Sequence, residues 1–246
     1  MVFAIRKVLS YLRLMDLPHF FEPYEDATSL VLSSNTHHHI HHVLRMREGN
    51  EALIVNGKGN SAHIRLTQVS KKNCDYVLLS QQQHKQPHGK LHIAISFTKN
   101  LSRIEWFLEK ACEIGIHVIT PLHTHRTEKL FFKRDRFEKI LQTAMLQSKQ
   151  FYLPILHDTT SLEEVCKQEA DVKCIAWCGE AEKKPLNTVL QKDKKTIILI
   201  GPEGDFTQEE VTLAQQQGYT PVSMGDTRLR TETAGVYACV AYNTAL

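Results

Sequence analysis

Residues 196–210 read TIILIGPEGDFTQEE, and this stretch decides the fold. Five strand-type residues, a threonine and four apolar residues, lead into the glycine-bearing loop GPEGDF, and a helix begins directly after that loop. Thr207 and Glu210 have the spacing of a capping box, in which each side chain bonds the backbone N–H of the other residue. Gly218 ends the predicted helix, because glycine readily adopts the left-handed conformation found after helix ends. A strand followed at once by a loop and a helix is typical of a parallel sheet.

The same alternation of strands and helices runs through residues 90–246. It predicts an α/β domain with a parallel sheet and helices on both of its faces. Ser102 and Glu105 form a second candidate capping box, and Gly115 ends the helix that follows it. We expect strands at 91–97, 116–122, 172–178, 196–200 and 221–224, and helices at 103–114, 134–150, 161–170, 207–217 and from about Thr231.

The first part of the chain has a different pattern. Ile40, Val43 and Leu44 have the i, i+3, i+4 spacing of a helix. The turns NGKGN and SKKN separate short runs that are typical of strands. We therefore expect a small β-rich domain, either a barrel or an open sheet, with a polar linker at 81–89 behind it. The three expected strands are 51–55, 61–69 and 74–80.

Composition and charge narrow the classes of function. No apolar run approaches the roughly 20 residues that span a bilayer. The N-terminal MVFAIRKVLSYLRL is interrupted by charges and lacks the features of a signal peptide, so we expect a cytoplasmic protein. The net charge is +3, and residues 1–89 hold ten Lys and Arg against seven Asp and Glu, with nine of the fourteen histidines. This distribution favours a polyanionic partner such as nucleic acid.

Neither the cysteines nor the histidines have the spacing of a metal site. The six cysteines include no CxxC pair, and two of them alternate with apolar residues in VKCIAWC (172–178), so we expect reduced thiols in the core. The internal HHHIHH (37–42) has no acidic or cysteine partner at suitable spacing. It precedes Arg45 and Arg47, and we expect a basic surface that faces RNA.

Two glycine-bearing loops follow successive strands near the C-terminus, GPEGDF (201–206) and MGDTRLRTET (224–233). In open α/β sheets, ligands bind outside the carboxyl ends of the strands, where glycine lets the backbone approach them closely. Neither loop matches GxGxxG or GxxxxGK[ST], which disfavours a dinucleotide or a triphosphate. A ligand held by backbone groups, such as an adenosyl group, fits better. Tight turns without a ligand are the alternative.

Together with HHVLRMREGN, EKACEIGIHVITPLHTHRTE and AMLQSKQFYLPIL, these loops resemble the motifs of the SPOUT-class RNA methyltransferases. Within that class the chain is similar to the 16S ribosomal RNA uracil-N3 methyltransferase family. The resemblance implies a small PUA-like β-barrel domain that binds RNA at 15–85 and a SPOUT-type α/β domain with a deep trefoil knot at 90–246. Residues 1–14 would be an extension that precedes the usual family start.

The resemblance also implies an activity. Members of this family use S-adenosylmethionine to methylate N3 of a uridine in the decoding region of 16S RNA in the small ribosomal subunit, and they act as homodimers through the C-terminal domain. Two rival functions stay open: a SPOUT methyltransferase that acts on another RNA such as tRNA, and a catalytically silent RNA-binding assembly factor. The intact GPEG and RLRTET motifs count against the silent factor.

Carried over by position, the resemblance implies a cofactor pocket with two sides. Arg230 and Glu232 would be catalytic, with Glu232 accepting or relaying the N3 proton and Arg230 stabilising charge on the uracil oxygens. The alternative for Glu232 is a favourable charge at the N-terminus of the last helix. The expected cofactor-binding residues are Ile200, Gly201, Pro202, Glu203 and Gly204 on one side, and Met224, Gly225, Leu229 and Arg230 on the other.

Five basic residues are candidate RNA contacts: Arg45, Arg47, Arg103, Arg126 and Lys129. The last two lie in THRTEKLFFKRDR (124–136), where phenylalanines interleave with basic side chains and suit exposed bases. A solvated loop with a hydrophobic plug is the alternative for this segment. Two positions depart from the family pattern. Gln150 stands in place of an arginine, which weakens one expected RNA or substrate contact, and Asp205 stands in place of a glycine beside the cofactor loops.

Overall fold

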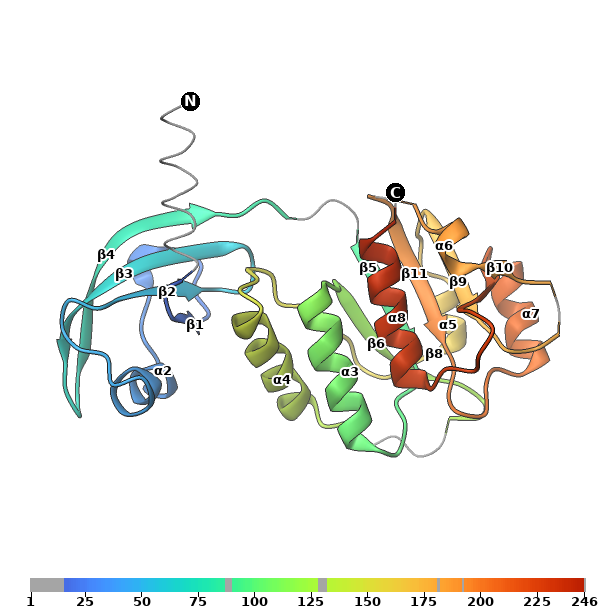
Figure 1. The fold of residues 1–246 in the computed structure, drawn as a ribbon, viewed down its shortest axis with the longest axis horizontal. Coiled ribbons are helices and arrows are strands. Elements are labelled where there is room, and N and C mark those ends of the chain that lie inside the picture. The colour runs from blue at the N-terminus through green and yellow to red at the C-terminus, as the bar shows by residue number, and fades with distance from the viewer. Residues whose placement is uncertain (1–15, 87–89, 128–131, 181, 192, 246) are drawn as a thin grey trace, which may run out of the picture. The chain divides into compact units, whose positions relative to one another are not determined.

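The structure is a computed structural model that describes residues 16–86, 90–127, 132–180, 182–191 and 193–245 (Figure 1). The chain forms two compact units. Unit 1 contains Met1–Gln86 and Met145–Leu153, and unit 2 contains Pro87–Ala144 and Pro154–Leu246. The domains predicted at 15–85 and 90–246 do not include this exchange of an internal segment. The predicted extension 1–14 and the candidate RNA contact Lys129 lie outside the described residues.

Unit 1 contains a sheet of four strands in the order β1-β2-β3-β4. β1 pairs with β2 in parallel, and the two other pairings are antiparallel. The described strands thus form a sheet with β1 and β4 at its two ends. The strands are β1 (His19–Phe21), β2 (Glu51–Val55), β3 (Asn60–Val69) and β4 (Cys74–Gln83), which confirms the three predicted strands after residue 50.

Three short helical segments pack with the core of this sheet. They are a 3-10 helix (Ala27–Ser29), α2 (Ser34–His38) and a π-helical turn, η2 (His39–Val43). Ile40 is fully buried with Ile54 and Ile64 of the sheet. The predicted helical stripe is only partly correct, because Val43 and Leu44 are exposed. The helix widens into a π turn at residue 39 and then ends, so these two side chains leave the core face.

The internal segment of unit 1 pairs with the turn between β2 and β3. Gly59 donates its N–H to the Phe151 carbonyl at 2.9 Å, and the Leu153 N–H bonds the Gly57 carbonyl at 2.8 Å. The Phe151 ring stacks on His84. The predicted linker at 81–89 is therefore wrong at its start, since β4 continues to Gln83 and His84 packs within unit 1.

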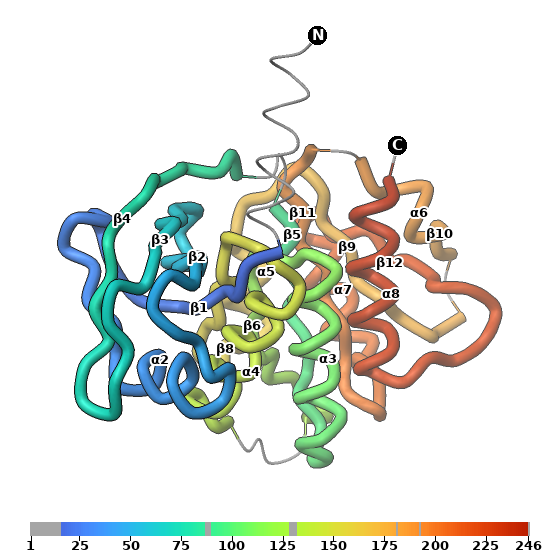
Figure 2. Tube along the Cα trace, turned by 60° about the vertical axis from the view of Figure 1, so that its left-hand side comes forward, coloured from blue at the N-terminus to red at the C-terminus, as the bar shows by residue number. Residues whose placement is uncertain are grey.

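Unit 2 contains a parallel sheet in the order β10-β12-β9-β11-β5-β6-β7, and β8 pairs with β6 (Figures 1 and 2). The prediction of a parallel α/β sheet is confirmed. β9, β11 and β12 are neighbours, so their carboxyl ends meet at one edge. The strands are β5 (Lys90–Ile95), β6 (Val118–His123), β7 (Ile155–Leu156), β8 (Thr160–Ser161), β9 (Val172–Ala176), β10 (Lys184–Pro185), β11 (Lys195–Ile200) and β12 (Thr220–Ser223).

Helices cover both faces of this sheet. α5 and α7 bury apolar side chains against alternate residues of β11, including Ile197 and Leu199. α3 and α8 lie side by side in both views, and α8 contacts β5 and β11 (Figures 1 and 2). The helices are α3 (Leu101–Ile114), α4 (Arg134–Gln147), α5 (Leu162–Cys166), α6 (Leu186–Val189), α7 (Gln208–Gln216) and α8 (Thr231–Asn243).

The helix ends test the capping predictions. Thr207 and Glu210 form both bonds of a capping box, as predicted. The second capping box is wrong, because α3 begins two residues earlier, at Leu101, and is capped by Asn100, whose side chain accepts the Ser102 N–H at 3.1 Å. Gly115 ends α3 with a φ of 109°, which confirms the predicted stop.

Candidate functional site

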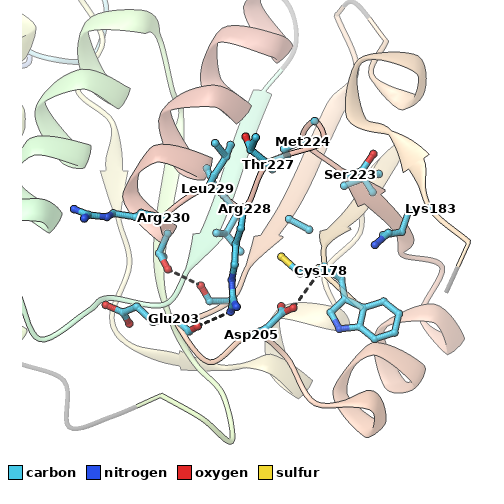
Figure 3. Close-up of a pocket in the computed structure, with 18 of the residues that line it drawn as sticks. Cys178, Lys183, Glu203, Asp205, Ser223, Met224, Thr227, Arg228, Leu229 and Arg230 are labelled. Carbon is cyan, nitrogen blue, oxygen red and sulfur yellow. Dashed lines mark hydrogen bonds between the residues drawn. The ribbon is translucent and has the colours of Figure 1, made fainter. Parts of the chain in front are cut away.

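A cavity of about 610 Å³ lies at the carboxyl ends of β9, β11 and β12 (Figure 3). Three loops contribute to it: residues 177–180 with 182–183 after β9, residues 201–206 after β11 and residues 224–230 after β12. The strand order brings these loops together although Trp177 in the first and Arg230 in the last lie 53 residues apart in the sequence. The lining of the cavity combines backbone groups with apolar side chains and a few charged side chains, which is typical of sites for small molecules. Ala176, Val222, Ser223, Thr231 and Ala234 complete the lining at the strand ends and the start of α8.

The loop after β11 is held in a specific conformation. Gly201 packs closely against Phe206, because an added Cβ would lie 3.1 Å from the Phe206 ring and would require the ring to shift. Asp205 has a φ of 64° and donates its N–H to the Pro202 carbonyl at 2.9 Å. The Asp205 carboxylate accepts the Cys178 N–H at 2.9 Å, which ties this loop to the one after β9.

The loop after β12 is tied to the loop after β11 by two hydrogen bonds. Arg228 Nη2 donates to the Glu203 carbonyl at 2.9 Å, and Thr231 Oγ1 donates to the Gly201 carbonyl at 3.1 Å (Figure 3). Gly225 has a φ of 110° and open space around its Cα, so its backbone is accessible to a ligand. The two loops that the sequence singled out therefore form one connected wall.

The structure brings most of the predicted cofactor-binding residues to this cavity. Gly204 is the exception: it does not line the cavity and lies against the Arg126 side chain, with an added Cβ 3.3 Å from Arg126 Cδ. The predicted residues that line the cavity are Ile200, Gly201, Pro202, Glu203, Met224, Gly225, Leu229 and Arg230.

Sequence reasoning missed the third loop of the cavity. Trp177, Cys178 and Lys183 of this loop line the cavity. Asp205 and Arg228, from the two loops that the sequence singled out, also line the cavity and were not among the predicted cofactor-binding residues. The signal that could have found them is the end of the predicted strand 172–178, since parallel strands expose their carboxyl ends at a common edge. The prediction that VKCIAWC is buried throughout is wrong at its end, because Cys178 lies beyond β9 and is exposed.

The two predicted catalytic residues have different environments. Arg230 lines the cavity and is the N-cap of α8, and in Figure 3 its side chain points away from the other labelled residues. Glu232 does not line the cavity. It is 6% exposed, in the first turn of α8, and its Oε1 lies 3.6 Å from Arg103 Nε. Its Oε2 is buried and has no hydrogen-bond partner among the described residues.

The four described candidate RNA contacts have different environments. Arg126 Nη1 donates to the Gly204 carbonyl at 2.6 Å, with a longer bond to the Phe206 carbonyl, so this guanidinium supports the loop after β11. Arg103 pairs with Glu232. Arg45 and Arg47 are exposed in unit 1 and follow the histidine-rich segment.

The described residues contain no group of three or more His, Cys, Asp or Glu side chains arranged to hold a metal ion. The cysteines are free. Burial raises the pKa of Cys174 to about 12, so this thiol stays protonated at neutral pH. None of the described helices has the length and apolar character that crossing a membrane requires.

Two family models match the chain. An RNA methyltransferase domain matches residues 84–243, and an RNA methyltransferase PUA domain matches residues 35–79. The chain is 28% identical to the ribosomal RNA small subunit methyltransferase E of Bacillus subtilis, over 90% of this chain and 93% of that protein.

Solved structures give the same picture. The probable rRNA-methyltransferase of Porphyromonas gingivalis is 33% identical, with a TM-score of 0.86 over 91% of this chain and 95% of that one. The ribosomal RNA small subunit methyltransferase E of Neisseria gonorrhoeae, bound to S-adenosyl methionine, is 26% identical, with a TM-score of 0.82 over 93% and 97% of the two chains.

Proposed function

The chain belongs to the RNA methyltransferase family, and from that premise we propose that it uses S-adenosylmethionine to methylate N3 of a uridine in the decoding region of 16S ribosomal RNA. The observation that carries the proposal is the cavity at the carboxyl ends of β9, β11 and β12, to which both glycine-bearing loops contribute. Relatives over nearly the whole chain are small-subunit ribosomal RNA methyltransferases, and one of their structures contains the cofactor.

The residues of the cavity fit the cofactor. Its volume of about 610 Å³ lies within the range of small-molecule sites. The Gly225 backbone faces open space, and apolar side chains such as Leu229 can enclose an adenosyl group. We assign the cofactor-binding role to the predicted residues that line the cavity, and add Trp177 and Asp205. When bound there, S-adenosylmethionine supplies an electrophilic methyl group, so the chain has to align N3 with it and exclude water.

We propose two catalytic roles for the start of α8. Glu232 accepts the proton that N3 of uracil must lose, because its carboxylate has one oxygen without a partner. Arg230, which borders the cavity, stabilises the negative charge that builds on the uracil oxygens. The position of Glu232 in the first turn of α8 also favours a negative charge, so the helix-terminus alternative is compatible with this role.

RNA would be held by exposed basic side chains. We propose Arg45 and Arg47 of unit 1 as phosphate contacts, together with Lys129, which lies outside the described residues. The PUA match at residues 35–79 includes the first two. The bonds of Arg126 to two loop carbonyls indicate that its main role is to shape the cofactor loop.

The remaining expectations also stay proposals. A homodimer through unit 2 would cover Trp106 of α3 and Tyr237 and Val240 of α8, which are large apolar side chains exposed to solvent. The ties between loops 201–206 and 224–231 are compatible with a trefoil knot. A ribosomal RNA substrate implies a cytoplasmic enzyme. A silent RNA-binding factor is disfavoured, because the cavity is intact at both loops.

The proposal is tested with purified protein, labelled S-adenosylmethionine and small ribosomal subunits that lack this modification. RNA is digested after the reaction, and nucleosides are identified by mass spectrometry. We expect 3-methyluridine, and we expect its formation to drop with Arg230→Ala or Glu232→Gln while cofactor binding persists in Glu232→Gln. Bound cofactor without methyl transfer to subunits or free 16S RNA would move the function to another RNA such as tRNA. If the unaltered protein does not bind S-adenosylmethionine, the catalytically silent RNA-binding factor is favoured.

A further inference from the structure

Arg103 and Glu232 form an ion pair between the first turns of α3 and α8. Arg103 Nε lies 3.6 Å from Glu232 Oε1, and the side chains are 34% and 8% exposed. The two helices lie side by side (Figures 1 and 2). The Glu232 carboxylate is therefore fixed from one side by a charge on another helix, and the pair is shielded enough from solvent for this attraction to matter.

The second oxygen of the same carboxylate is the unusual feature. Glu232 Oε2 is buried and has no hydrogen-bond partner in the part of the chain that the structure describes. Buried polar atoms are nearly always paired in native proteins. This oxygen of the Glu232 carboxylate can therefore accept a hydrogen bond from a bound substrate.

A second unpaired atom lies on the same side of unit 2. Thr98 Oγ1 is also buried without a partner, and Thr98 belongs to the connection between β5 and α3, five residues before Arg103. Thr98 is 7% exposed. β5 is the neighbour of β11 in the sheet, so this connection begins at the edge that carries the cavity.

The ion pair borders the cofactor cavity without being part of it. Thr231, the residue before Glu232, lines the cavity, and so does Arg230. α8 thus carries cavity residues and the buried carboxylate within a single turn. A nucleobase that enters beside the cavity could meet both.

We propose that Arg103 is a positioning residue for Glu232: it holds Oε1 so that Oε2 is aimed at the N3–H of the substrate base. This inference rests on the proposed function. In the step, the N3–H bond breaks and its proton goes to Glu232 Oε2. The electron pair left on N3 forms the new bond to the methyl carbon, and the bond between that carbon and sulfur breaks with its electron pair kept by sulfur.

This role differs from the phosphate contact that the sequence suggested for Arg103. A phosphate contact contributes to RNA affinity and makes that affinity depend on salt, with a slope that falls by about one when the contact is removed. A positioning residue changes the rate of the bound complex and leaves both affinities unchanged, because small misplacements of a reacting group lower the rate strongly.

The test is a double-mutant cycle in single-turnover reactions with saturating cofactor and RNA. The variants are Arg103→Gln, Arg103→Lys, Glu232→Gln and the double variant Arg103→Gln/Glu232→Gln. Arg136→Gln is the matched control, because Arg136 also forms an ion pair with a glutamate of α3, Glu105. Cofactor affinity, RNA affinity at several salt concentrations and melting temperature are measured for each variant.

We expect Arg103→Gln to lower the rate by about 10- to 100-fold with both affinities within about twofold of the unaltered protein. Arg103→Lys should recover part of that loss, and the double variant should be no slower than Glu232→Gln, because residues that act as a unit are not additive. Arg136→Gln should react at the unaltered rate.

Two results would overturn the assignment: weaker RNA binding with a smaller salt slope at an unchanged rate, or rate losses that add in the double variant. An unaltered protein that produces no 3-methyluridine would instead overturn the proposed function. If it methylates another base, the same cycle in that reaction still decides whether Arg103 acts through Glu232.

Discussion

The Asp205 carboxylate accepts the backbone N–H of Cys178 at 2.9 Å and joins two loops of the cavity that lie 27 residues apart. The other carboxylate oxygen accepts the Phe206 N–H at 2.8 Å. The backbone of Asp205 has a φ of 64°, a conformation that glycine adopts most easily. The acid at this position thus combines a strained backbone with a bond that glycine could not make.

Asp205→Gly is expected to weaken cofactor binding by about 3- to 10-fold, because a lost hydrogen bond of ordinary strength corresponds to that range. The free energy of unfolding of Asp205→Gly should change by no more than about 1 kcal/mol, since glycine adopts the positive φ without strain and this gain offsets the lost hydrogen bond. Asp205→Asn is the control: it tolerates positive φ and keeps an acceptor oxygen. Titration calorimetry with S-adenosylmethionine measures the affinities. Equal affinity for Asp205→Gly and the unaltered protein would show that the tie has no part in forming the site.

Arg126→Gln is expected to weaken cofactor binding by about 3- to 10-fold, because Arg126 donates to the carbonyls of Gly204 and Phe206 in the loop after β11. The salt dependence of RNA binding should stay unchanged. Arg47→Gln serves as the contrast, since Arg47 is exposed and is proposed to contact phosphate. That variant should keep cofactor affinity and reduce the salt slope by about one. A reduced salt slope in Arg126→Gln together with weaker cofactor binding in Arg47→Gln would contradict both roles.

Gly235→Ala is expected to destabilise unit 2 by about 1–3 kcal/mol or more, because an added Cβ would lie 2.4 Å from Phe107 Cε2 and 3.0 Å from Ile95 Cδ1. The glycine lets α8 approach α3 and β5 closely. Thr233→Ala on the same helix is the control, because Thr233 is exposed and its replacement should cost about 0.5 kcal/mol or less. Urea unfolding measures both. An unchanged midpoint for Gly235→Ala would mean that α8 can shift without loss.

The features that the sequence predicts well are those with local causes. The capping box of Thr207 and Glu210 needs only four consecutive residues, and the structure forms both of its bonds. Strand β2 coincides with the predicted 51–55, because the run is apolar and bounded by turn residues. The start of α8 at Thr231 also agrees with the prediction.

The features that the sequence does not reveal depend on contacts between distant segments. Trp177 and Lys183 line the cavity because β9 lies between β12 and β11 in the sheet, and strand order is not encoded in any one segment. Gly204 faces Arg126, 78 residues away. The exchange of Met145–Leu153 into unit 1 depends on pairing with residues 57–59, which no local pattern indicates.

The stability of unit 2 should depend on pH through a buried histidine of β5. His92 Nε2 lies 2.8 Å from Thr120 Oγ1, and the same hydroxyl lies 3.0 Å from His157 Nδ1. Burial lowers the pKa of His92 from 6.5 to about 4, and the nearby His157 and Lys195 add to the shift. The folded protein therefore keeps this imidazole neutral where the unfolded chain protonates it.

Between pH 6.5 and about 4 the unfolded chain binds more protons at His92 than the folded protein does, so the free energy of unfolding falls as pH falls. The contribution of the neutral His92 to the free energy of unfolding is fully present above pH 6.5, and its complete loss corresponds to roughly 3 kcal/mol. His92→Gln can still donate to Thr120 and does not titrate, so its stability should fall less across this window. Urea unfolding at pH 7.5, 6 and 5 compares the two proteins. His123→Gln, at an exposed position, should follow the unaltered protein. If the free energy of unfolding falls with pH equally in His92→Gln and in the unaltered protein, groups other than His92 cause the acid sensitivity.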